Sequence, residues 1–251
     1  MRHIPSLIIF LALAVLSGLG GITAARSEKN ASIPNPSGFL GKPSSYAWPR
    51  AVNPLHIVVI FTKWKGEAPG EDRAPSWAND IFNGQPGSVN DYFNAVSFGQ
   101  ITVTGEFYDK MIEMPYDSTY YRTSAKYTED IIRLLDEDPE FDFAKYDNDG
   151  LDRIPNSGDD DGYADYIVLM PMSRPYNFIL RLATGVMNLN LADTYYTRDR
   201  RAFGGTIMVD KYSGCISVAR YRTHAVGAIA AEVAHAFGAV DLMDKVYETK
   251  E

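Results

Sequence analysis

A stretch near the C-terminal end, GAIAAEVAHAFGAVDLMD from Gly227 to Asp244, constrains the fold most. Apolar residues recur here at steps of three and four: Val226, Ile229, Ala230, Val233 and Phe237. This spacing predicts an amphipathic helix with one apolar stripe. Gly238 stands where a left-handed residue would end such a helix, and Asp241 then comes back towards the helix end.

Two polar residues of this helix indicate a possible site. Glu232 and His235 lie off the apolar stripe, three residues apart, so both can point into one cleft. In zincin peptidases two histidines at i and i+4 hold zinc, and the glutamate between them takes a proton from zinc-bound water. Here Ala231 occupies the position of the first histidine, and its methyl group cannot coordinate a metal.

The N-terminal segment predicts export from the cell. Arg2 and His3 precede a short apolar run that ends in small residues near Ala24 and Ala25, as in a secretory signal peptide over residues 1–25. The alternatives are a retained anchor and a membrane-spanning helix. Residues 26–53 are rich in Ser, Pro, Asn and Gly and predict a linker or N-terminal arm, which leaves 54–251 as one domain.

The composition argues against intrachain disulfides and against nucleic acid or anionic membranes as partners. Cys215 is the only cysteine, so no intrachain disulfide can form, and it is interpreted as a small buried hydrophobe. The formal net charge is −8, and Asp136 to Asp165 alone contain twelve Asp or Glu and two Lys or Arg. Without a basic patch, neither nucleic acid nor an anionic membrane surface is expected as a partner.

The rest of the chain predicts an α+β domain, with helices packed on a twisted mixed sheet and the motif helix near the C-terminus. Strands are expected over residues 54–61, 101–107, 165–172 and twice within 204–220, and helices over 87–99, capped by Ser88, and over 127–135. His56 lies in the first strand and is interpreted as a core or strand-end histidine.

An acidic loop from Tyr146 to Asp165 predicts a calcium site. So many carboxylates repel one another unless a cation neutralises them, and calcium accepts six to eight oxygen ligands in flexible geometry. The candidate ligands are Asp147, Asp149, Asp159, Asp161 and Asp165. Asp159, Asp161 and Gly162 match half of an EF-hand loop, without the bidentate glutamate. The alternative is a solvated acidic loop.

Three segments together resemble the immune inhibitor A family of secreted bacterial zinc metallopeptidases. They are GSVNDYFNAVSFGQITVTGEFY (87–108), YDNDG with DDDGYADYIVLM (146–170), and the motif stretch (227–244), and PLHIVVIF matches more weakly. The resemblance covers most of the chain after residue 54. It implies a zincin-like fold, zinc as cofactor, a protein or peptide substrate, and the acidic loop as a calcium site.

The family motif reads HExxHxxGxxD, so the resemblance implies His235 and Asp241 as zinc ligands and Glu232 as the catalytic base. Ala231 leaves two ligands where a catalytic zinc site normally has three. In family members the chain continues past the motif, and this further segment forms the floor of the active site and contains a methionine turn. The chain ends at Glu251 and Met243 is no counterpart of that methionine, so a C-terminally truncated domain is expected.

Three hypotheses therefore remain. The chain is a secreted metallopeptidase-like protein that is impaired or inactive, a non-catalytic calcium-stabilised binding or structural domain, or a piece of a longer enzyme. His224 could replace the lost ligand only from outside the helix, because eleven residues of continuous helix separate it from His235 by about 16 Å. His56 is the other candidate for that role.

Overall fold

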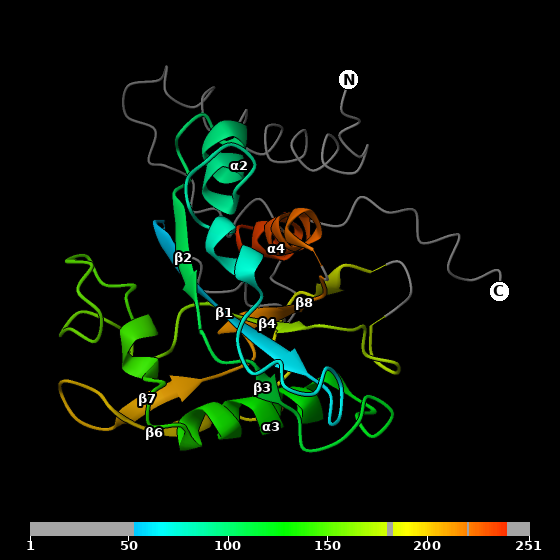
Figure 1. The fold of residues 1–251 in the computed structure, drawn as a ribbon. Coiled ribbons are helices and arrows are strands. Elements are labelled where there is room, and N and C mark those ends of the chain that lie inside the picture. The colour runs from blue at the N-terminus through cyan, green and yellow to red at the C-terminus, as the bar shows by residue number, and fades with distance from the viewer. Residues whose placement is uncertain (1–52, 180–182, 220, 240–251) are drawn as a thin grey trace, which may run out of the picture.

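A mixed β-sheet forms the centre of the protein. The computed structural model describes residues 53–179, 183–219 and 221–239 (Figure 1). The sheet has the strand order β2 (Val103–Phe107), β1 (Leu55–Lys63), β4 (Ile167–Pro171), β8 (Gly214–Ser217) and β5 (Gly185–Val186), and β3 (Ile112–Glu113) pairs with the end of β1. All these pairings are parallel except that of β5 with β8, which is antiparallel.

Helices and a hairpin surround this sheet. The α-helices are α2 (Val89–Val96), α3 (Ser124–Glu137) and α4 (Arg222–Ala236), and two short 3-10 turns are η3 (Ser76–Asp80) and η4 (Phe143–Tyr146). A separate hairpin consists of β6 (Tyr195–Arg200) and β7 (Thr206–Val209). The expected α+β class is confirmed at this level.

Side chains along β1 point alternately to the two faces of the sheet, and the core accordingly has two layers. Ile57, Val59 and Phe61 pack with residues of α2 and α4, whereas Val58 and Ile60 pack with α3 and the β6–β7 hairpin. Successive strand residues point to opposite faces of a sheet, so a continuous β-branched run buries both faces. Accordingly α2 and α4 lie on one side of the sheet in Figure 1, and α3 with the hairpin on the other.

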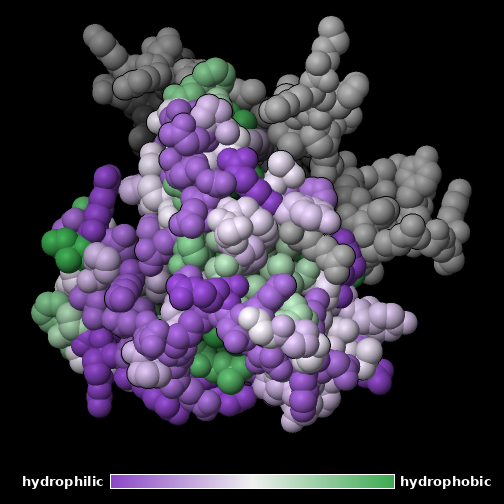
Figure 2. Space-filling view, viewed as in Figure 1, coloured by the Kyte–Doolittle hydropathy of each residue, from purple (hydrophilic) through white to green (hydrophobic). Residues whose placement is uncertain are grey.

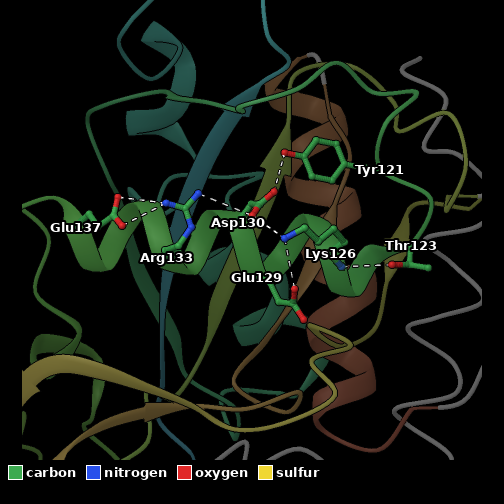
Figure 3. A network of polar contacts seen from close by, with 7 residues as sticks. All are labelled: Tyr121, Thr123, Lys126, Glu129, Asp130, Arg133 and Glu137. Atoms are coloured by element: carbon green, nitrogen blue, oxygen red, sulfur yellow. Dashed lines mark hydrogen bonds and ion pairs between the residues drawn. The ribbon is translucent and has the colours of Figure 1, made fainter.

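Helix α3 shows how the sequence separates core from solvent. Its Thr123 side chain accepts a hydrogen bond from the Lys126 amide at the N-terminus. Asp130 is buried, accepts a hydrogen bond from the Tyr121 hydroxyl at 3.1 Å and pairs with Lys126 at 3.0 Å (Figure 3). Ile131 and other apolar residues of α3 pack into the core with Val58 and Ile60 of β1. Charged pairs therefore cover the outer face of α3.

Most expected elements are confirmed with shifted ends, and Ser88 caps α2 by accepting a hydrogen bond from Asp91. Helix α4 differs more, because it begins at Arg222 and contains His224 in its first turn. Gly238 ends the helix with φ +92, as expected for a left-handed C-cap. The predicted signal peptide (1–25), almost all of the linker (26–53) and Asp241 lie outside the described residues.

Candidate functional site

Helix α4 places Glu232 inside the protein, beside the edge strand β5. The Glu232 side chain is buried, with 4% of its surface exposed. Its Oε1 accepts a hydrogen bond from the Thr184 hydroxyl at 2.8 Å, and its backbone carbonyl accepts one from the Tyr166 hydroxyl at 3.3 Å. A Cβ added at Gly185 would lie 2.9 Å from Glu232 Oε1 and only 2.0 Å from the Ile216 carbonyl oxygen. The glycine therefore allows β5 to lie close to β8 and to this carboxyl group.

His235 lies one turn further along α4 and is partly buried. Its Nδ1 is 2.9 Å from the carbonyl oxygen of Ala239. Because a carbonyl only accepts, this contact requires a proton on Nδ1, as an Nε2 metal ligand also does. Ala231, one turn earlier, carries only a methyl group.

The described residues do not form a three-ligand zinc site around His235. Within the described ranges, the only cluster of three or more potential ligands is an aspartate group that does not include His235. His224 is exposed in the first turn of α4, so about 16 Å of helix separates it from His235. His56 lies on β1, where its Nδ1 is 2.9 Å from the Thr104 hydroxyl oxygen. Neither histidine replaces the ligand that Ala231 lacks.

Two further residues near Glu232 are buried, Cys215 and Tyr166. Cys215 on β8 is fully buried, which confirms its interpretation as a small core residue. Burial raises the pKa of the Cys215 thiol, and also that of the Tyr166 hydroxyl, well above the usual ranges. A thiol with a raised pKa in an apolar setting stays protonated and is a poor nucleophile.

The acidic loop contains the aspartate cluster. One carboxylate oxygen from each of Asp147, Asp149 and Asp165 lies within 4.8 Å of the others. Asp147 and Asp165 are buried, and Asp149 is partly buried. Asp147 follows η4 directly and Asp165 leads into β4, so the cluster sits where the loop begins and ends. We refer to these three residues as the aspartate triad.

Backbone amides hold the triad in place. Asp147 Oδ1 accepts a hydrogen bond from the Gly162 amide at 3.1 Å, and Asp165 Oδ2 accepts one from the Asn148 amide at 2.9 Å. The Asp161 amide donates to Asp149 Oδ1 at 3.2 Å. Each of these hydrogen bonds engages one oxygen of its carboxylate and so fixes the orientation of that side chain.

The other predicted calcium ligands serve the loop backbone. Asp159 Oδ2 accepts hydrogen bonds from the amides of Leu151 and Asp152 at 2.6 and 3.2 Å. Asp161 Oδ1 accepts one from the amide of Tyr163 at 2.9 Å. Asp160, which sequence analysis did not select, is buried and accepts from the amides of Gly150 and Ser157. Because Asp159, Asp160 and Asp161 are consecutive aspartates, the sequence does not indicate which of their side chains is buried.

Crowding changes the acidity of the triad. Burial, together with the nearby charges of Asp160, Asp161 and Asp149, raises the pKa of Asp147 to about 7. Burial, together with the charges of Asp149, Asp147 and Asp161, raises the pKa of Asp165 to about 8. A divalent cation would offset both effects, because its charge at close range stabilises the ionised carboxylates.

The donor set suits calcium better than zinc. All donors are oxygen, whereas zinc prefers nitrogen and sulfur ligands in a closed tetrahedron. Asn148, between two members of the triad, has a buried side-chain oxygen Oδ1 that accepts no hydrogen bond from any residue the structure describes. Such an oxygen could serve as a further calcium ligand, since amide carbonyls are common in calcium sites.

The raised pKa values predict how the metal-free protein responds to pH. Unfolded aspartates release their protons near pH 4, but folded Asp147 and Asp165 hold theirs up to about pH 7 and about pH 8. Between these limits the folded state binds more protons, so its stability falls as pH rises. We expect the free energy of unfolding, measured by urea denaturation without metal, to fall by more than about 1.4 kcal/mol from pH 5 to 8.

The double variant Asp147→Asn with Asp165→Asn should show a clearly flatter pH profile, because neither amide side chain titrates. An equal decline in this variant and in the wild type would assign the pH dependence to other groups.

No protein-family model matches the chain, and no curated protein matches it. None of the helices in the described part is both long and apolar enough to cross a membrane.

Proposed function

We propose that this protein is a secreted, zincin-like metallopeptidase domain of the immune inhibitor A type whose zinc site is incomplete, so that its peptidase activity is impaired or absent. The acidic loop holds a structural calcium ion. The observation that carries the proposal is the position of Ala231 on α4, one turn before His235 and next to Glu232. A methyl group stands where the first zinc ligand would lie.

The surroundings of Glu232 support a peptidase-like origin. The motif helix packs against a mixed sheet, and its glutamate lies beside the antiparallel edge strand β5. An edge strand offers unpaired backbone groups that an extended peptide can bind. In this protein Glu232 instead accepts a hydrogen bond from Thr184, as a carboxylate does when it has a structural role.

Restoring the missing ligand tests the proposal. We expect Ala231→His to bind zinc at near one equivalent, and the wild type to bind well below that, measured by metal analysis after dialysis. Any gain in casein hydrolysis by the variant should require Glu232. A general base typically contributes about 10²- to 10⁴-fold, so adding Glu232→Gln should remove the activity but keep the zinc.

Two outcomes would count against this account. A wild-type protein that already holds one zinc tightly and cleaves casein would show that Ala231 does not disable the site. A variant Ala230→His, which places an imidazole one position away from the motif, provides the matched control. Equal zinc binding by this control and by Ala231→His would show that the motif geometry is irrelevant.

The second candidate function is a non-catalytic binding or structural domain that calcium stabilises. The aspartate triad favours it, because the triad and its amide contacts do not depend on α4. Under this hypothesis Ala231→His gains no zinc, while calcium still raises the melting temperature. Both functions include the calcium ion, so zinc binding by Ala231→His is the result that separates them.

A further inference from the structure

The acidic loop has an exposed tip that carries a single basic residue. Every residue from Leu151 to Pro155 is exposed, and Leu151 and Ile154 are 97% and 60% exposed. In Figure 2 hydrophobic atoms stand out on the left edge of the molecule, where Figure 1 shows this loop. Arg153 is the only Lys or Arg between Tyr146 and Asp165. Exposed loop tips are preferred sites of proteolysis, and trypsin-like proteases select a basic residue through a carboxylate in their specificity pocket.

The folded tip has the wrong backbone conformation for cleavage. Arg153 has φ +59, in the left-handed region, and its amide donates to the Gly150 carbonyl at 3.3 Å. The Ile154 amide donates to Asp152 Oδ1 at 2.9 Å. A protease binds its substrate as an extended strand, through the same backbone groups. The tip must therefore open before the Arg153–Ile154 bond can be cut.

Hydrogen bonds connect the tip to the aspartate triad. Directly behind the tip, the Asn156 amide donates to the Asp147 carbonyl at 2.6 Å. Asp149, the partly buried member of the triad, lies four residues before Arg153 in the chain. Extending the chain around Arg153 would break the first contact and draw Asp149 away from Asp147 and Asp165. A cation held by all three carboxylates therefore favours the closed tip.

We propose that the Arg153–Ile154 bond is a cleavage site for an arginine-specific serine protease, and that calcium in the aspartate triad controls its exposure. This control rests on the calcium site of the proposed function. Hydrolysis adds one water molecule across the peptide bond and leaves a carboxylate on Arg153 and an amino group on Ile154. The cut places Asp147 and Asp149 on a different fragment from Asp165. A secreted protein built in this way persists where calcium is plentiful and is nicked where calcium falls.

Linkage gives the size of the expected effect. When the loop opens and closes faster than the protease cuts, the cleavage rate follows the population of the open loop. A ligand that binds only the closed loop lowers this population by a factor set by the ratio of its concentration to its dissociation constant. Calcium at about 100 times its dissociation constant should therefore slow cleavage about 100-fold.

Limited trypsin digestion of the full chain, in calcium and in EDTA, tests the proposal. Mass spectrometry identifies each cut, and a chromogenic arginine peptide corrects for any effect of calcium on trypsin itself. In EDTA we expect the first cut between residues 53 and 239 at Arg153–Ile154, and in calcium about 100-fold slower cutting there. Arg153→Gln should remove this cut. Arg122→Gln, which replaces an exposed arginine outside the loop, should retain it.

A thermal melt of the same samples separates this cleavage site from the calcium site. Arg153→Gln should keep the calcium-induced rise in melting temperature. A wild type that calcium stabilises, but whose Arg153–Ile154 bond is cut equally fast in calcium and in EDTA, would overturn the control and leave the calcium site intact. A first cut at another bond between residues 53 and 239, or equal protection of all bonds by calcium, would also overturn the proposal. A melting temperature that calcium does not raise would contradict the calcium site itself.

Discussion

Calcium is expected to raise the melting temperature of this protein by about 5–10 °C when it is present at about 100 times its dissociation constant. At that excess a ligand that binds only the folded state contributes about 2.7 kcal/mol, and a domain of this size gains about 2–4 °C per kcal/mol. The physical source is the aspartate triad, where burial and mutual repulsion disfavour three negative charges until a cation compensates them. Differential scanning calorimetry in calcium and in EDTA measures the shift.

Variants of the triad should abolish this shift. Asp147→Asn with Asp165→Asn keeps the side-chain shapes but removes two charges, so calcium should no longer stabilise the protein. In EDTA at pH 8 the same variant should be more stable than the wild type, because the crowded charges are gone. Asp193→Asn, an exposed aspartate outside the acidic loop, serves as the control. A shift that survives in the double variant would place calcium elsewhere.

Alanine at Gly214 is expected to be the most destabilising small substitution in the sheet, at about 3 kcal/mol or more. Gly214 begins β8 with φ +149, and an added Cβ would lie 1.9 Å from the Ile167 carbonyl oxygen of β4. That atom belongs to the backbone of a central strand, so the contact can be relieved only if β4 and β8 separate. Urea denaturation measures the loss.

Gly227→Ala in α4 is the matched control for this substitution. A Cβ at Gly227 meets no heavy atom within 4 Å, and alanine is favoured over glycine inside a helix by about 0.5–1 kcal/mol. The control should therefore be slightly more stable than the wild type. If Gly214→Ala unfolds at the same urea concentration as the wild type, the close contact between β4 and β8 is wrong.

The fold could be predicted where burial dictates the sequence pattern. The strands β1 and β4 are buried on both faces and appear as continuous apolar runs, and α2 and α3 have capping residues and apolar periodicity. Strand β6 reads YYTRDR, and its only buried residue is the polar Thr197, so the sequence carries little apolar signal there. The start of α4 escaped prediction because Tyr221 at its N-cap makes no side-chain capping bond.

The candidate site could be predicted only in part, because local sequence patterns do not reveal contacts between residues far apart in the chain. The spacing of Glu232 and His235 follows from one helix, and the acidic loop is visible as a local excess of aspartates. The contact between Thr184 and Glu232 joins residues 48 positions apart and depends on how β5 lies beside α4. The choice of Asp165 over Asp159 for the triad depends on loop hydrogen bonds, which no local pattern specifies.

Crystals grown with zinc chloride test most directly whether Ala231 leaves the motif unable to hold zinc. Anomalous diffraction above and below the zinc absorption edge locates any bound ion beside His235. The account predicts no site there with full tetrahedral coordination in the wild type, and a strong anomalous peak in Ala231→His. A fully occupied four-coordinate zinc beside His235 and Asp241 in the wild type would contradict it.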